Sequence, residues 1–237
     1  RPSNGKIEFV SCKFHTHCAG MDESGLGRVI ARVEQRMRGI SADHDFYHCF
    51  DVFLLCMGAL ACIGLPTDAM FDVLLAAILH EVDDRKLFNT VDYAHARKIM
   101  LEELGYVSER CIRMISKVST SANGICTDGP SWELLPSYAD KCLSLGLVGI
   151  GRTLEYTLGK GQPLFTDATL RITTEEELRA ISTARFADYK GNSVSMIDHF
   201  YDKLLYFAYN LHSGNTFLDA KIAEARQLTI EYVLYFG

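Results

Sequence analysis

Apolar residues recur every three or four positions along most of this chain, which is the spacing of helices with one buried face. The first such stripe joins Val29, Ile30, Val33 and Met37. Alternation of apolar and polar residues with a period of two, which would indicate strands, is scarce. The pattern therefore predicts an all-α fold, a single helical bundle whose facing helices direct side chains into the core.

Turn and capping residues divide this pattern into successive helices. One helix begins at Thr67, the expected N-cap, and runs to His80. Thr174 opens a capping box and so begins another helix. Residues 121–130 and 159–173 contain Gly and Pro and are predicted to be loops. The helix that begins at Thr174 is expected to end at residue 187. The other expected helices cover residues 90–104, 108–118, 130–145, 146–157 and 194–236, the last with a break near Ser213-Gly214.

The length and composition are those of one ordinary globular domain. The chain has 237 residues, of which 48% are hydrophobic and 23% are charged. Residues 1–22 are polar, carry Gly, Ser and Pro, and are expected to form a flexible arm ahead of a helical domain at 23–237. The Cys/His run from Cys12 to Cys18 in this arm matches no common zinc-site spacing, so a mobile extension is the favoured interpretation.

Net charge and cysteine usage limit the classes of binding partner and the cellular compartment that we expect. The chain has a net charge of −6 and no basic stripe, which argues against nucleic-acid polymers as partners. Most of the eight cysteines lie in apolar helical runs, where reduced, buried thiols are favoured over disulfides. The longest apolar run, Val52 to Leu65, is too short to span a bilayer. These features predict a cytoplasmic protein that does not bind membranes, and they leave a homodimer open.

Polar residues that interrupt the apolar stretches are the candidate ligands of a metal. His48 shares the buried stripe of its helix, and Asp140 lies among the leucines of another. A long apolar run ends in His80-Glu81, and Asp84 is expected on the same helical face as His80. Acidic groups at a helix C-terminus are unfavourable unless a cation compensates them. Imidazole and carboxylate together favour a divalent ion of Mn, Fe, Co, Ni or Zn over Mg.

Four segments around these residues resemble one known family. They read His44-Asp45-Phe46-Tyr47-His48, then His80-Glu81 followed by Asp83-Asp84-Arg85-Lys86, then Ala139-Asp140-Lys141-Cys142 followed by Gly146-Leu147-Val148-Gly149-Ile150-Gly151-Arg152-Thr153, and last Ile197-Asp198-His199-Phe200-Tyr201-Asp202-Lys203-Leu204-Leu205. In order and spacing they resemble the HD-domain metal-dependent phosphohydrolases, specifically the small branch that cleaves nucleotides, from about residue 40 to residue 236. The doublet that names that family is His-Asp, whereas this chain has His80-Glu81.

The resemblance implies a metal centre and the residues that form it. The implied ligands are His48, His80, Glu81 and Asp140. Because Glu is one methylene longer than Asp, Glu81 is expected to reach the metal either directly or through one water.

Phosphate hydrolysis at such a centre also needs catalytic and substrate-binding residues, and position along the helices gives the candidates. The candidate catalytic residues are Asp84, which would handle the proton, Glu81 and Lys86. The candidate substrate-binding residues are His44, Arg152, His199 and Lys203. For Lys86 and Arg152, ordinary surface charge is an equally good interpretation, and His44 can instead orient His48.

The implied function is metal-dependent hydrolysis of nucleoside triphosphates, related nucleotides or another small phosphorylated metabolite. Two alternatives stay open. If Glu81 prevents the activation of water, the chain is a nucleotide-binding module without hydrolysis. If a second iron binds to extra histidines, for which His44 and His199 are the nearby candidates, the chain is an iron-dependent oxygenase.

Overall fold

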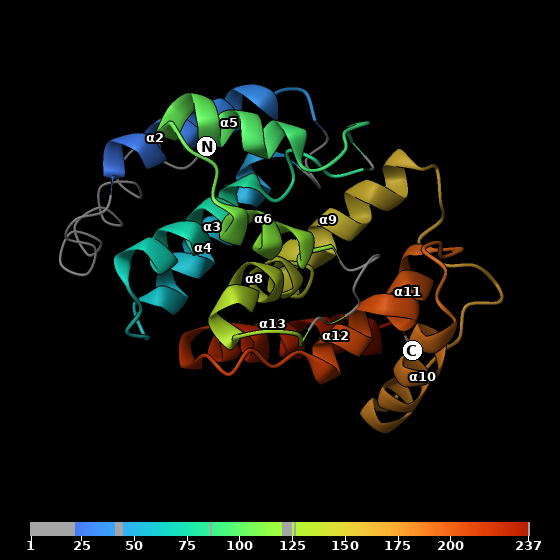
Figure 1. Ribbon diagram of the computed structural model, residues 1–237. Coiled ribbons are helices and arrows are strands. Elements are labelled where there is room, and N and C mark those ends of the chain that lie inside the picture. Colours follow the sequence, from blue (N-terminus) through green and yellow to red (C-terminus); the bar gives the residue numbers. More distant parts are fainter. Residues whose placement is uncertain (1–21, 41–44, 86, 120–124, 126, 237) are drawn as a thin grey trace, which may run out of the picture.

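The computed structural model describes residues 22–40, 45–85, 87–119, 125 and 127–236, and it is shown in Figure 1. These residues form helices and connecting segments without any strand, which confirms the predicted all-α class. The α-helices are α2 (Glu23–Arg36), α3 (Phe46–Leu60), α4 (Thr67–Leu79), α5 (Ala94–Leu104), α6 (Glu109–Ser116), α8 (Leu135–Leu143), α9 (Gly146–Gly159), α10 (Glu175–Asp188), α11 (Met196–His199), α12 (Leu205–Asn210) and α13 (Thr216–Leu234). A 3₁₀ turn, η2 (Ser131–Leu134), precedes α8, and a π-helical turn, η3 (Phe200–Leu204), joins α11 to α12.

Helix α4 lies at the centre of the first of two hydrophobic cores. All its residues from Ala69 to Leu79 are buried, and apart from Asp72, which pairs with Arg110, they are apolar. Helices α2, α3, α6 and α8 pack against it. In Figure 1 these elements fill the upper and central part of the molecule, with α5 beside α2.

The second core forms around η3 and α12, in the orange part of Figure 1. Phe200, Tyr201 and Phe207 are fully buried there. Helix α13 packs against α3 and α8 on one side and against α9 and α12 on the other. It therefore ties the two cores together, and Ala225 on α13 packs against both.

Several predicted boundaries are confirmed. Thr174 caps α10, because its hydroxyl accepts from the backbone N–H of Glu177. Gly105 ends α5 in the left-handed conformation that favours glycine, with φ of 80°. The predicted break near Ser213-Gly214 is also present, since α12 ends at Asn210 and α13 begins at Thr216.

Other boundaries are corrected by the backbone. The helix expected from residue 90 begins only at Ala94, because Asp92 and Tyr93 adopt left-handed φ values of 51° and 55° that no helix continues through. Thr67 is the first helical residue and not the N-cap, which is Pro66. The helix expected over 130–145 is divided into η2 and α8.

The predicted arm at 1–22 lies outside the described residues except for Asp22, so its flexibility and its boundary stay predictions. Asp22 is the N-cap of α2 and accepts from the backbone N–H of Gly25. Among the described cysteines, Cys49, Cys56, Cys111 and Cys142 are buried free thiols, and Cys62 is an exposed free thiol. Cys12, Cys18 and Cys126 lie outside the described part of the chain. Within that part, no helix is both long enough and apolar enough to cross a membrane.

Candidate metal centre

Helix α3 carries His48 on its first turn, on the side that faces the core. Asp45 is the N-cap, and its carboxylate accepts from the backbone N–H of His48 at 3.0 Å. The His48 side chain is buried, with 4% of the residue exposed. The Asp of the His44-Asp45-x-x-His48 segment therefore begins the helix that presents the imidazole, while His44 lies outside the described residues.

The end of α4 carries His80 and Glu81. Helix α4 ends at Leu79, and His80 is its C-cap. The His80 Nδ1 lies 2.8 Å from the Ala77 carbonyl oxygen. Because only a protonated Nδ1 can donate to that carbonyl, the Nε2 atom of neutral His80 presents its lone pair to the site. Both His80 and Glu81 are buried, with 7% and 5% of each residue exposed.

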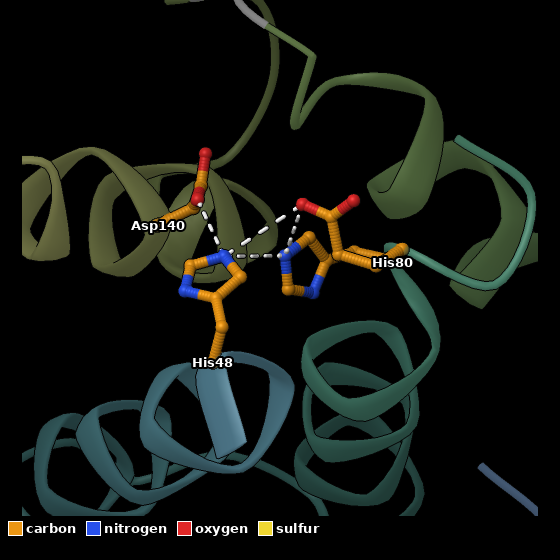
Figure 2. Close-up of side chains that lie close together, drawn as sticks. His48, His80 and Asp140 are labelled. Carbon is orange, nitrogen blue, oxygen red and sulfur yellow. Dashed lines mark hydrogen bonds and ion pairs between the residues drawn. The ribbon is translucent and has the colours of Figure 1, made fainter. Parts of the chain in front are cut away.

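Helix α8 brings Asp140 to the same place from the opposite side. Figure 2 shows His48, His80 and Asp140 pointing toward one another from three separate helical segments. The Asp140 side chain is 21% exposed, the largest value among the four predicted ligands, so access from solvent is on its side of the group.

The four predicted ligands form one compact group. The two imidazole Nε2 atoms lie 3.3 Å apart. Asp140 Oδ1 lies 3.1 Å from His48 Nε2, and Glu81 Oε1 lies 3.4 Å from His80 Nε2 and 3.7 Å from His48 Nε2. All four ligand atoms lie within 4.8 Å of one another, and they are the one such group of three or more among the described residues.

The electrostatics of the group are those of a site for a cation. Burial lowers the pKa of His48 despite the opposing contact with Asp140. Burial alone would lower the pKa of His80 too, but its hydrogen bond to Glu81 and the charges of Glu81 and Asp140 raise that pKa above the ordinary value. For Asp140, burial is outweighed by the His48 hydrogen bond and by the charges of both histidines and of Arg152, which lower its pKa.

The donor set fits a divalent metal. The two Nε2 atoms lie 3.3 Å apart, so whenever both imidazoles present lone pairs there, a cation between them relieves their repulsion. Two carboxylate oxygens converge on the same space, so the group offers two nitrogen and two oxygen ligands to one ion. That set suits Mn, Fe, Co, Ni or Zn, and a buried group of this charge is costly without a compensating cation.

Comparison with known proteins shows which family the chain belongs to. No protein-family model matches it. The uncharacterized protein L803 of Acanthamoeba polyphaga mimivirus is 34% identical over 215 residues, which cover 82% of this chain and 88% of that protein. The chain belongs to the same family as this viral protein.

Solved structures show which fold the chain has. An HD-superfamily hydrolase from Bacillus thuringiensis is 21% identical and covers 89% of this chain and 94% of its own, with a TM-score of 0.60. A protein from Lactobacillus plantarum is 20% identical and covers 91% of this chain and 96% of its own, with a TM-score of 0.65. Bacillus subtilis YpgQ, solved in complex with ADP, is 17% identical and covers 88% of this chain and 91% of its own, with a TM-score of 0.58. These likenesses show that the chain has the HD fold.

The segment after the His80-Glu81 doublet of this HD-fold chain differs from the prediction. Asp84 does not share a helical face with His80, because α4 has already ended at Leu79. The Asp84 side chain is not among the four grouped ligands. Its neighbour Asp83 is buried instead, and its carboxylate accepts from the backbone N–H groups of His95 and Ala96 at the start of α5. Lys86, the other candidate catalytic residue here, lies outside the described residues.

The predicted substrate-binding residues divide into two sets. Arg152 on α9 is close enough to the metal group for its charge to lower the pKa of both His48 and Asp140. The contacts described for His199 join it to Ser193 and Tyr189.

The remaining candidate, Lys203, belongs to η3, and its ammonium lies 5.9 Å from the centre of the Phe207 ring. The charge of Arg152 thus acts on the four grouped ligands, whereas the contacts described for His199 and Lys203 lie beside the second core. The roles of all three residues stay predictions.

Proposed function

We propose that this chain is a metal-dependent phosphohydrolase that acts on nucleotides, with nucleoside triphosphates as the first substrates to test. The observation that carries the proposal is the buried group of two imidazole nitrogens and two carboxylate oxygens, with the charge of Arg152 beside it. Two similarities add support: one HD-fold neighbour is named as a hydrolase, and another was solved with a nucleotide, ADP.

The proposed chemistry divides between the ion and the protein. A divalent ion held by the group would lower the pKa of a bound water and polarise a phosphoryl oxygen. Arg152 would bind the spectator oxygens of the phosphate, since its charge acts on the same space as His48 and Asp140. Burial of His48 and His80 limits water around the reacting phosphate and strengthens these charge interactions.

Further residues complete the proposal. Asp84 follows the buried doublet and is half-buried, and we assign it the transfer of a proton to the leaving group. Lys86 stays a proposed catalytic residue, and His44 a proposed substrate-binding residue. His199 and Lys203 would bind the part of the substrate that lies away from the metal. The proposed binding partner of this site is therefore its substrate, a small phosphorylated molecule.

A hydrolysis screen tests the proposal directly. We expect release of phosphate or pyrophosphate from nucleoside triphosphates when Mn, Co or Ni is added, with less release when Mg is added. His80→Ala should abolish that release, whereas His212→Ala, which replaces a largely exposed histidine far along the chain, should not change it. Metal and nucleotide binding without any hydrolysis would instead support a binding module, and oxygen uptake with two bound irons would support an oxygenase.

Glu81→Asp provides a further prediction. The variant should keep the bound metal and should keep or raise the rate of hydrolysis, because it restores the shorter carboxylate of the HD doublet. Metal content by elemental analysis and kcat with a nucleoside triphosphate are the measurements. A large loss of kcat in a folded, metal-loaded variant would show that the longer side chain, whose Oε1 lies 3.4 Å from His80 Nε2, is fitted to the reaction.

A further inference from the structure

Lys141 is a fully buried lysine that directly follows Asp140 on α8. Only 1% of the residue is exposed. Removing an ammonium group from water is costly, so such a group persists only where hydrogen bonds replace its hydration. Adjacent residues of a helix do not face each other, and the described hydrogen bonds of Lys141 go to Val118 and Ser137.

The Lys141 ammonium connects α8 to the chain just beyond α6. Its Nζ donates to the Val118 carbonyl at 3.1 Å and to Ser137 Oγ at 2.7 Å. Ser137, one turn earlier on α8 and also buried, donates its own hydroxyl proton to the Lys117 carbonyl at 3.1 Å. Two side chains on one face of α8 therefore bind two consecutive carbonyl groups.

These bonds fix the rotation of α8 about its own axis, which apolar packing controls poorly. The rest of the helix is almost wholly buried among apolar groups, and hydrophobic burial has no preferred direction. Charge-assisted hydrogen bonds are short and directional, so they set the rotation of α8 about its axis. A side-chain atom lies about 5–6 Å from a helix axis, so a rotation of about 20° moves it by about 2 Å. Such a rotation would break the 3.1 Å contact between Asp140 and His48.

We propose that Lys141, together with Ser137, is a positioning residue of the metal centre. Its ammonium holds α8 against the end of α6 and thereby holds the Asp140 carboxylate at the two histidines. The inference rests on the proposed function only insofar as that function needs a metal at this group. It assigns to Lys141 no contact with metal or substrate.

The test compares two lysine-to-methionine variants of the full chain. Lys141→Met keeps the length of the side chain and removes the ammonium. Lys117→Met is the matched control, because the Lys117 ammonium binds the Asp128 carbonyl and Glu133 in the same region without reaching α8. Affinity for Mn²⁺ is measured by calorimetry in the absence of substrate. We expect Lys141→Met to lose about tenfold in affinity, the low end of what supporting residues of metal ligands contribute, and Lys117→Met to stay within about twofold.

A purely structural role would lower the melting temperature of Lys141→Met without changing metal affinity in the folded protein, and that result would overturn the inference. If Lys141→Met does not fold, Ser137→Ala removes one bond of the same set. A smaller loss of affinity in Ser137→Ala would support positioning, and wild-type affinity would overturn it.

The test is separable from the proposed hydrolysis. A wild-type protein that binds Mn²⁺ but hydrolyses no nucleotide would contradict the proposed function and leave this comparison intact. If the wild-type protein binds no Mn²⁺, crystal structures of the wild type and of Lys141→Met would test the inference instead. An increased distance between Asp140 Oδ1 and His48 Nε2 would then support the inference, and an unchanged distance would overturn it.

Discussion

Replacing His80 or Asp140 by alanine should abolish the binding of a divalent metal. Each residue supplies one of four ligand atoms that lie within 4.8 Å of one another. Loss of a residue that merely supports a ligand lowers metal affinity by about 10- to 100-fold, so loss of a ligand itself should exceed about 100-fold. Calorimetric titration of the metal-free protein with Mn²⁺ measures the effect, and anomalous scattering locates the ion.

The matched controls are His212→Ala and Asp219→Ala. The exposed His212 lies 2.9 Å from the half-buried Asp219, so the same residue types are removed outside the group of four ligands. Both controls should bind Mn²⁺ as the wild type does. An ion located away from His48, His80 and Asp140, or retained by both site variants, would refute the proposed centre.

The pH dependence of metal affinity follows from the same group. His80 has a raised pKa, because the Glu81 hydrogen bond and nearby negative charge outweigh its burial. Since only deprotonated Nε2 can bind a metal, protons compete with the ion below that pKa. Affinity should therefore rise with pH through the ordinary histidine value of 6.5 and level off above the raised pKa of His80. Asp140 should not contribute to this dependence, because its lowered pKa keeps it ionised throughout.

The placement of His48 could be predicted from local sequence because burial of one helical face is a local property. His48 lies on the same stripe as Val52 and Ala59, and all three residues are buried. The proximity of His48 to Asp140, nearly a hundred positions later, is not a local property. It was accessible only through the resemblance of four ordered segments to one family.

Asp83 and Asp84 show where local sequence is insufficient. Which of two adjacent carboxylates turns inward depends on the residue at which α4 ends, and the end of a helix is set by tertiary contacts. Here Asp83 binds the first backbone N–H groups of α5, whose start is delayed by the left-handed Asp92 and Tyr93. Neither residue is a glycine, the residue type that marks this backbone conformation most clearly in a sequence.

Lys141 shows a second limit. Its position next to Asp140 suggests an ion pair between neighbours, but one partner of its ammonium is the Val118 carbonyl, 23 positions away. A backbone carbonyl is available at every residue, so no residue type in the sequence marks this partner. Only the packing of α8 against α6 identifies it.

Arg152→Ala and Lys203→Ala should each raise the KM for a phosphorylated substrate more than they change metal affinity. Arg152 acts electrostatically on His48 and Asp140 from α9, where it can bind a phosphate oxygen without replacing a ligand. Lys203 is expected to bind substrate from η3 in the second core. Loss of a charge-assisted hydrogen bond costs about 1.5–3 kcal/mol, which corresponds to about 10- to 100-fold in kcat/KM.

The control for this last comparison is Lys160→Ala, which removes an exposed positive charge just beyond the end of α9. Steady-state kinetics with a nucleoside triphosphate should show a normal KM for the control and a raised KM for the other two variants. Added salt should weaken the wild type more than Arg152→Ala or Lys203→Ala, because screening acts on an interaction that those variants lack. A normal KM in Lys203→Ala alone would show that Lys203 does not bind the substrate and that the substrate site does not extend to η3. Normal kinetics in both variants would show that these charges are surface residues and that phosphate approaches the metal group from elsewhere.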